Sequence, residues 1–93
     1  MALNLFMRDN PNIWGFIMWE KDFAKLKLVL SDNLKTLRHE RGIAQERLGL
    51  ESGVDRTLVS KIERQIANPS IEILSKIAAC LQVSVVELLT KKK

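Results

Sequence analysis

The chain has 93 residues, of which 46% are hydrophobic and 28% are charged, with 15 Lys and Arg against 11 Asp and Glu. This length provides one small core, which argues against a two-domain enzyme, and the nearly balanced charges argue against disorder. A single cysteine and a single histidine can form neither an internal disulfide nor a structural zinc site.

The net charge of +4 is concentrated at the C-terminus. Residues 31–90 carry eight basic and eight acidic side chains, whereas residues 91–93 are all lysines. The overall charge is therefore weak evidence for nucleic-acid binding, and such a function must depend on where individual cations lie. We expect residues 91–93 to form a frayed basic tail, with non-specific attraction to phosphates as the alternative.

Residues 1–29 match no motif and form an apolar N-terminal extension of unknown role. The longest apolar run, residues 13–19, has seven residues, whereas a membrane span needs about 20. No basic segment precedes this run as in a signal peptide, so we expect a cytoplasmic protein with no membrane partner. Pro11 and Gly15 should break any long helix, and because its many apolar side chains would be unfavourable in solvent, the extension is expected to pack on its own domain or across a dimer. Translation starting at Met18 would instead make residues 1–17 dispensable.

Residues 30–90 have helical periodicity and no alternating strand pattern, which predicts an all-α domain of five helices. The first helix is expected to end at Gly42 and to begin either after a Ser31 cap or nearer Asp22. Its apolar residues recur at i, i+4 and i+7: Leu30, Leu34 and Leu37.

The next two helices are predicted to form a helix-turn-helix. One begins near Gln45 and ends at Gly53, and the other follows Asp55, whose carboxylate can cap it. Gly53 allows a positive φ in the turn, and a side chain larger than that of Gly49 would collide with the second helix. The residues expected to fill the space between the helices are Leu48, Val54, Val59 and Ile62.

The last two helices follow from capping signals. The loop Asn68-Pro69-Ser70 should lead into a helix that extends to about Gln82, and residues 84–87 have the spacing of a capping box that opens a short helix through Thr90. The apolar stripe of the longer helix consists of Ile71, Leu74, Ile77, Ala78 and Leu81. Cys80 lies at the edge of this stripe and is expected to be a buried thiol, while His39 on the first helix should face solvent.

The third helix has a short, polar and cationic face opposite its apolar residues Leu58, Val59 and Ile62. Glu63 is expected at the edge of this face, with no other acid on it. Such a face suits the DNA major groove, because Arg and Lys can donate to guanine while Ser and Thr can contact base edges or phosphates. We define this surface as the cationic arc: Arg56, Thr57, Ser60, Lys61 and Arg64.

These elements belong to a longer series of motif residues: Leu34 to Arg38, Gln45, Leu48, Gly49, Gly53-Val54, Asp55, Val59, Ile62-Glu63-Arg64, Asn68-Pro69-Ser70, Leu74, Ala78, Leu81, Val83 and Ser84. At these positions residues 30–90 resemble the phage repressor and Cro-type helix-turn-helix family, also called the XRE family. Residues 50–57 and 60–64 look most like the controller proteins of restriction-modification systems. The resemblance implies a five-helix, phage-repressor-like DNA-binding domain.

The resemblance also implies roles for individual residues. Arg38 and Glu63 would form an ion pair between the first and third helices, and Gln45 would contact a DNA phosphate. The family usually has Gly where this chain has Gln65. A left-handed conformation there would cost about 1–2 kcal/mol, so we expect the loop after the third helix to be reshaped.

These observations predict a transcriptional regulator that binds a roughly palindromic operator on double-stranded DNA as a homodimer. Base contacts are expected from Arg56, Thr57, Ser60 and Lys61, and phosphate contacts from Gln45, Arg64 and Asn68. A dimer interface is predicted at Val85, Val86, Leu88 and Leu89, because one subunit is not expected to bury so many neighbouring apolar residues by itself. We expect no catalysis, metal or cofactor. The alternatives are an antitoxin or phage-type repressor, and a helical interaction module that binds no DNA.

Overall fold

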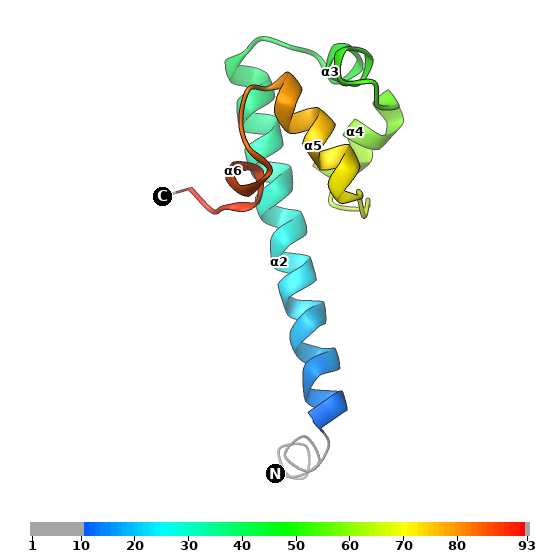
Figure 1. Ribbon diagram of the computed structural model, residues 1–93, viewed down its shortest axis with the longest axis vertical. Helices are drawn as coiled ribbons and strands as arrows, with labels where there is room; N and C mark the ends of the chain where they lie inside the picture. Colours follow the sequence, from blue (N-terminus) through cyan, green and yellow to red (C-terminus); the bar gives the residue numbers. More distant parts are fainter. Residues whose placement is uncertain (1–10, 93) are drawn as a thin grey trace.

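The computed structural model describes residues 11–92, which contain five α-helices and no strand. The helices are α2 (Pro11–Glu40), α3 (Gln45–Ser52), α4 (Arg56–Glu63), α5 (Ile71–Cys80) and α6 (Val85–Leu89). Figure 1 shows that the C-terminal part of α2 and the four short helices form a compact domain, from which the rest of α2 projects. The all-α, five-helix expectation is confirmed for the described residues.

Helix α2 is much longer than expected. It begins at Pro11 and runs unbroken through Gly15 for 30 residues, about 45 Å at 1.5 Å per residue. Proline is tolerated as the first helical residue because an N–H there would have no intrahelical partner, and one internal glycine costs only about 1 kcal/mol. The predicted starts at Ser31 and near Asp22 were therefore wrong, and no break separates residues 1–29 from the domain along the described part of this helix.

Helix α2 ends where the sequence predicted. Gly42 has a φ of 61°, the left-handed conformation that closes many helices. Its N–H donates to the His39 carbonyl, and the N–H of Ile43 donates to the Arg38 carbonyl. The chain then turns directly into α3.

Leucine, isoleucine and valine side chains from all five helices form or border one core. Helix α2 packs on α4 and α6, α3 packs on α4 and α5, and α5 also packs on α6. Ile71 was wrongly predicted to join the core, since it lies at the first position of α5 and is 77% exposed. The buried core residues include Leu30, Leu34, Leu37, Leu48, Val54, Val59, Ile62, Leu74, Ile77, Ala78, Leu81 and Leu88.

A buried asparagine holds α6 against α2. The Asn33 side-chain amide donates to the carbonyls of Glu87, Leu88 and Thr90 at 3.2, 2.8 and 2.9 Å. These carbonyls lie at the C-terminal end of a five-residue helix and have few other partners. At the other end of α6 the predicted capping box of Ser84 and Glu87 is present. Sequence reasoning found the cap but not Asn33.

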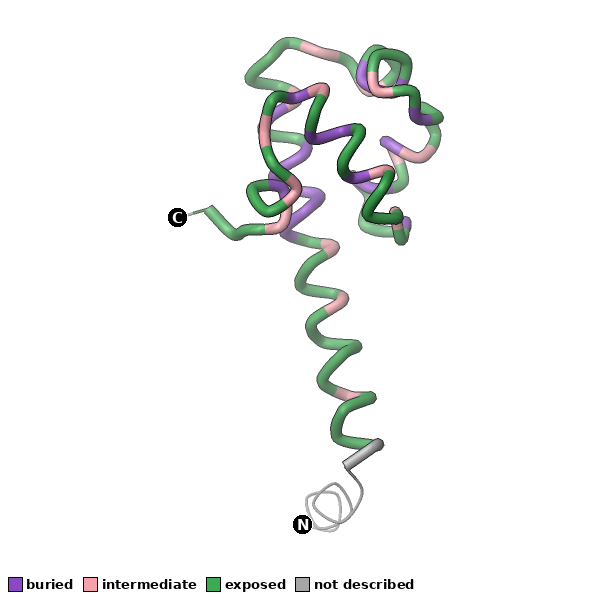
Figure 2. The backbone as a smooth tube through the Cα atoms, in the orientation of Figure 1, coloured by how far each residue is buried: buried purple, intermediate pink, exposed green. Residues whose placement is uncertain are grey.

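Most of the projecting part of α2 does not pack on the domain. Figure 2 shows it mostly exposed up to the point where α2 meets the other helices, and its exposed side chains include Trp14, Phe16 and Trp19. The expectation that this segment packs on its own domain is therefore wrong for most of residues 13–28, although Asn68 of the loop after α4 borders a hollow on this helix. Leu3, Leu5 and Phe6, also part of the apolar extension, and Lys93 lie outside the described residues.

No helix within residues 11–92 is both long and apolar enough to cross a bilayer. The same part of the chain contains no group of three or more His, Cys, Asp or Glu side chains that could hold a metal ion.

Candidate nucleic-acid interface

Two glycines allow α3 and α4 to approach closely. Gly53 adopts a φ of 73°, and its N–H donates to the carbonyls of Gly49 and Leu50. A Cβ atom on Gly49 would lie 2.7 Å from the carbonyl oxygen of Val54 and 3.0 Å from the Cα of Arg56. Real Cβ atoms do not approach backbone so closely, so both glycine requirements predicted from the sequence are confirmed.

Asp55 starts α4 as predicted. Its Oδ1 accepts a hydrogen bond from the backbone N–H of Thr57 at 2.8 Å. That backbone hydrogen bond is the main cause that lowers the pKa of Asp55. The carboxylate is therefore charged at neutral pH, and its negative charge stabilises the N-terminal end of the helix dipole.

The cationic arc lies on the outer face of α4. Val59 and Ile62 point into the core, whereas Arg56, Thr57 and Lys61 are exposed and Ser60 is half-buried. The four predicted base-contacting side chains therefore lie on one accessible face. Arg64, the C-cap of α4, and Asn68, in the following loop, are also exposed.

The arc has an acidic neighbour that sequence reasoning missed. Glu46 on α3 forms an ion pair with Arg56, with 2.9 Å between Oε2 and Nη1. Both side chains are exposed and line a shallow hollow together with Gln45, Thr57 and Ser60. The expectation that only Glu63 borders the arc was therefore wrong on two counts, because Glu63 itself is only 3% exposed.

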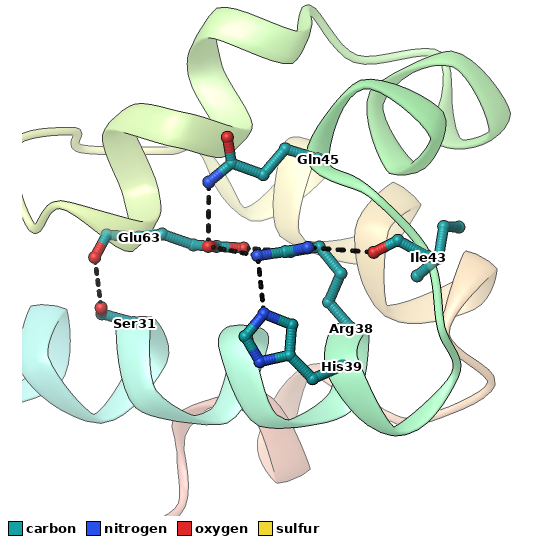
Figure 3. A network of polar contacts seen from close by, with 6 residues as sticks. All are labelled: Ser31, Arg38, His39, Ile43, Gln45 and Glu63. Atoms are coloured by element: carbon teal, nitrogen blue, oxygen red, sulfur yellow. Dashed lines mark hydrogen bonds and ion pairs between the residues drawn. The ribbon is translucent and has the colours of Figure 1, made fainter.

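Glu63 is the centre of a polar network between α2, α3 and α4 (Figure 3). Arg38 donates from Nε to Oε2 at 2.7 Å and from Nη2 to Oε1 at 3.0 Å, which is a bidentate ion pair. Gln45 donates to the same Oε1 at 3.0 Å, and Arg38 also donates to the Ile43 carbonyl at 3.0 Å. The ion pair that the resemblance implied is thus present, and it holds α4 on α2.

A second contact fixes the backbone of the same residue. The Ser31 hydroxyl, buried inside α2, donates to the Glu63 carbonyl at 2.6 Å (Figure 3). Ser31 therefore ties α2 to the end of α4 and is not the helix cap that the sequence suggested.

The charge state of Glu63 follows from these contacts. Burial alone would raise the pKa of Glu63, but hydrogen bonds from Arg38 and Gln45 and the positive charge of Arg38 outweigh it and lower the pKa. The buried carboxylate is therefore ionised at neutral pH. One amide hydrogen of the half-buried Gln45 is used in this network, at the N-terminal residue of α3.

The loop after α4 keeps the conformation that favours glycine. Gln65 has a φ of 64°, its N–H donates to the Ile62 carbonyl, and the N–H of Ile66 donates to the Lys61 carbonyl. The expected reshaping was therefore wrong, and the chain accepts a left-handed glutamine at a cost of about 1–2 kcal/mol.

The predicted dimer residues separate into two groups. Val86 is exposed, and Val85 and Leu89 are half-buried. Leu88 is fully buried in the core of its own subunit, so it offers no surface to a partner and was wrongly assigned.

The cysteine and the histidine both lie outside the cationic arc, on α5 and α2. Cys80 is half-buried, with Sγ 3.8 Å from Oε2 of Glu51, and burial, aided by that carboxylate, raises the pKa of its thiol. His39 is exposed as expected, and its Nε2 lies 3.2 Å from Nη2 of Arg38.

Comparison with known proteins agrees with this geometry. Residues 34–88 match the protein family described as Helix-turn-helix, HTH_3. A Neisseria meningitidis protein described as a hypothetical transcription factor is 38% identical over 68 residues, which cover 73% of this chain and 64% of that protein. The control protein C.SmaI of Serratia marcescens is 33% identical over 70 residues, which cover 75% of this chain and 83% of that protein. This chain thus spans less than two thirds of the Neisseria relative.

Solved structures are also similar. The crystal structure of the transcription factor NHTF from Neisseria aligns with a TM-score of 0.69 and 38% identity, covering 71% of this chain and 76% of that chain. The restriction-modification controller protein C.AhdI of Aeromonas hydrophila aligns with a TM-score of 0.64 and 34% identity, covering 67% of this chain and 94% of that chain. The chain belongs to the HTH_3 helix-turn-helix family of DNA-binding transcriptional regulators.

Proposed function

We propose that α4 is a recognition helix that enters the DNA major groove and reads base edges with Arg56, Thr57, Ser60 and Lys61. The observation that carries this proposal is the position of these four side chains on one accessible face of a helix whose opposite face packs into the core through the buried Val59 and Ile62. The bidentate pair of Arg38 and Glu63 keeps α4 at a constant angle, which base readout requires.

Phosphate contacts are proposed on both sides of this face. Gln45 lies at the start of α3, where free backbone amides can also donate to an anion. Arg64 and Asn68 lie beyond the other end of α4 and are exposed. These contacts position the helix and carry no sequence information. The lysines of the tail add sequence-independent attraction to phosphates.

The active species is proposed to be a homodimer formed through α6. Val86 supplies the exposed apolar centre, with the half-buried Val85 and Leu89 beside it. A two-fold axis through this patch would relate the two α4 helices, as the half-sites of a palindromic operator, about 34–36 Å apart in successive major grooves, require.

The finer biological role is proposed to be control of a restriction-modification system. This proposal is supported by the similarity of this chain to controller proteins over most of their length, because the match covers 94% of C.AhdI and 83% of C.SmaI. An antitoxin or phage-type repressor would use the same DNA surface. The two roles differ in the operator, which would lie before a restriction-modification operon in the first case.

The test combines selection of bound sequences from random DNA with gel shifts on the selected operator. Arg56→Ala should weaken operator binding by about 1–3 kcal/mol and random-DNA binding much less. Arg47→Ala is the matched control, because Arg47 is an equally exposed arginine in an ion pair on α3 but outside the arc. If no sequence is enriched, or both variants bind the operator like the parent, the chain does not read DNA through α4.

A further inference from the structure

The projecting part of α2 carries an apolar seam, which we define as the exposed Phe16, Trp19 and Leu26 together with the half-buried Phe23. The intervals of three and four residues place these side chains on one helix face. The ring centroids of Phe16 and Trp19 are 5.5 Å apart and those of Trp19 and Phe23 are 6.2 Å apart, so the seam is continuous. Figure 2 shows this part of the helix largely uncovered.

The seam continues the face that packs inside the domain. Leu30 follows Leu26 by four residues, and Leu34 and Leu37 extend the same series into the core. The resulting repeat of three and four residues is the pattern by which helices pair along a narrow stripe. The chain therefore uses one half of the stripe to hold its own domain and leaves the other half available.

We infer that the seam is a second self-association surface, on which the α2 helices of two copies of this chain pair in antiparallel orientation. The direction follows from sterics. From Leu30 onward the domain covers this face, and Asn68 of the loop after α4 already borders the hollow lined by Trp19, Phe23 and Leu26. A parallel partner helix would run into this domain, whereas an antiparallel partner places the two domains at opposite ends.

The exposed area fits weak pairing of two copies. Trp19 is 50% exposed and Phe16 53% exposed, and a fully exposed aromatic side chain offers roughly 150–250 Å², so each copy contributes about 400 Å² from the seam. With the flanking residues, the paired helices would bury about 1,000 Å² in total, near the lower end for specific interfaces. The expected association is therefore reversible.

The charges beside the seam favour a protein partner over a lipid surface. Between residues 13 and 28 the helix carries Glu20 and Asp22 together with three lysines, so it lacks the strongly basic face that draws a helix to anionic lipid. A two-fold pair needs only this one face, repeated.

The surface is separate from the one proposed on α6, and the two can be tested independently. Val86→Glu should abolish association through α6 while leaving the fold intact, because Val86 is 71% exposed. Sedimentation equilibrium of this variant, over about 1 to 200 µM, should then show a shift from the 10.6 kDa chain toward twice that mass. Adding Trp19→Glu should return the protein to monomer across this range.

The chain contains its own matched control. Trp14 is 52% exposed, like Trp19, but lies about 140° away around the helix, so Trp14→Glu in the same background should leave the dimer intact. Helix content is compared by circular dichroism for all variants. Equal loss of association in both tryptophan variants would overturn the assignment to the seam.

Two further results would overturn the inference. The first is a Val86→Glu chain that stays monomeric throughout the concentration range. The second is co-sedimentation of the monomeric Val86→Glu chain with vesicles of phosphatidylcholine and phosphatidylglycerol.

A fluorescence experiment tests the seam without an α6 variant. In the Trp14→Phe chain, emission from Trp19 should shift to the red on dilution, whereas in the Trp19→Phe chain emission from Trp14 should not change. The opposite pattern would also reject the seam.

Discussion

Removing Arg38 should strongly destabilise the domain, because its partner Glu63 is almost completely buried. Arg38→Ala deletes two charge-assisted hydrogen bonds to Glu63, at 2.7 and 3.0 Å, and leaves a carboxylate that is 3% exposed with only Gln45 as a side-chain donor. Breaking a buried pair in this way costs about 3–5 kcal/mol. The lower end applies here, because Arg38 is itself 12% exposed and water can enter the space it vacates.

Thermal unfolding followed by circular dichroism measures this loss. A destabilisation of about 3 kcal/mol should lower the Tm of a domain of this size by roughly 12–24 °C. Arg47→Ala is the control, because Arg47 pairs with Glu51 at 2.6 Å but both side chains are exposed, so its Tm should match the parent. Adding Glu63→Gln to Arg38→Ala should recover part of the loss, since no buried charge then remains without its cation.

The effect of pH on the contribution of Glu63 to stability should change sign between the parent and Arg38→Ala. In the parent the pKa of Glu63 lies below its ordinary value of 4.5, so its contribution to stability is present above that pH and is lost as the pH falls through the folded-state pKa. Without Arg38, burial should raise this pKa, so the penalty of Arg38→Ala should shrink between pH 7 and 4. Equal Tm values for Arg38→Ala and Arg47→Ala at pH 7 would show that the pair does not hold α4.

Five other substitutions test the interface, the turns and the long helix α2. Arg64→Ala should weaken binding to operator and random DNA equally and lower the slope of log K against log salt by about one unit per half-site. Lys61→Ala should instead weaken mainly the binding to the operator. A sequence-dependent loss for Arg64→Ala in gel shifts would contradict its proposed phosphate contact. Gly49→Ala should cost about 1–3 kcal/mol in urea unfolding because its Cβ would meet backbone 2.7 Å away, whereas Gly15→Ala, with open space around it, should stabilise by up to about 1 kcal/mol. Gln65→Gly should raise stability by up to about 1 kcal/mol by relieving a left-handed φ of 64°, and an unchanged or lower Tm would argue against strain there.

Features determined by a few neighbouring residues could be predicted from the sequence. The caps at Asp55 and Ser70, the capping box at Ser84 and the left-handed glycine at position 42 each depend on contacts within one or two turns. Their chemistry is local, so spacing alone was sufficient.

Features that depend on how helices pack could not be found in this way. Glu46 and Arg56 are ten residues apart, and they meet only because α3 and α4 cross at Gly49. Asn33 reaches carbonyls more than 50 residues away. Leu88 and Val86 look alike in the sequence, and only the position of α6 against α2 decides which of them is buried. The length of α2 was missed because Pro11 and Gly15 were read as helix breakers, although the first position of a helix tolerates proline.

Helix α2 also determines how strictly the proposed dimer would discriminate between operators that differ in half-site spacing. Asn33 anchors α6 and Arg38 anchors α4, and the two anchors are only five positions apart on one rigid helix. In the proposed dimer, the distance from the two-fold axis to each recognition helix would then be set by a single α-helical segment with no hinge in it. One base pair added between half-sites rotates them by about 35° relative to each other. Such an operator would have to bend or untwist to engage both subunits, so half-site spacing should discriminate between operators as sharply as the bases that α4 contacts.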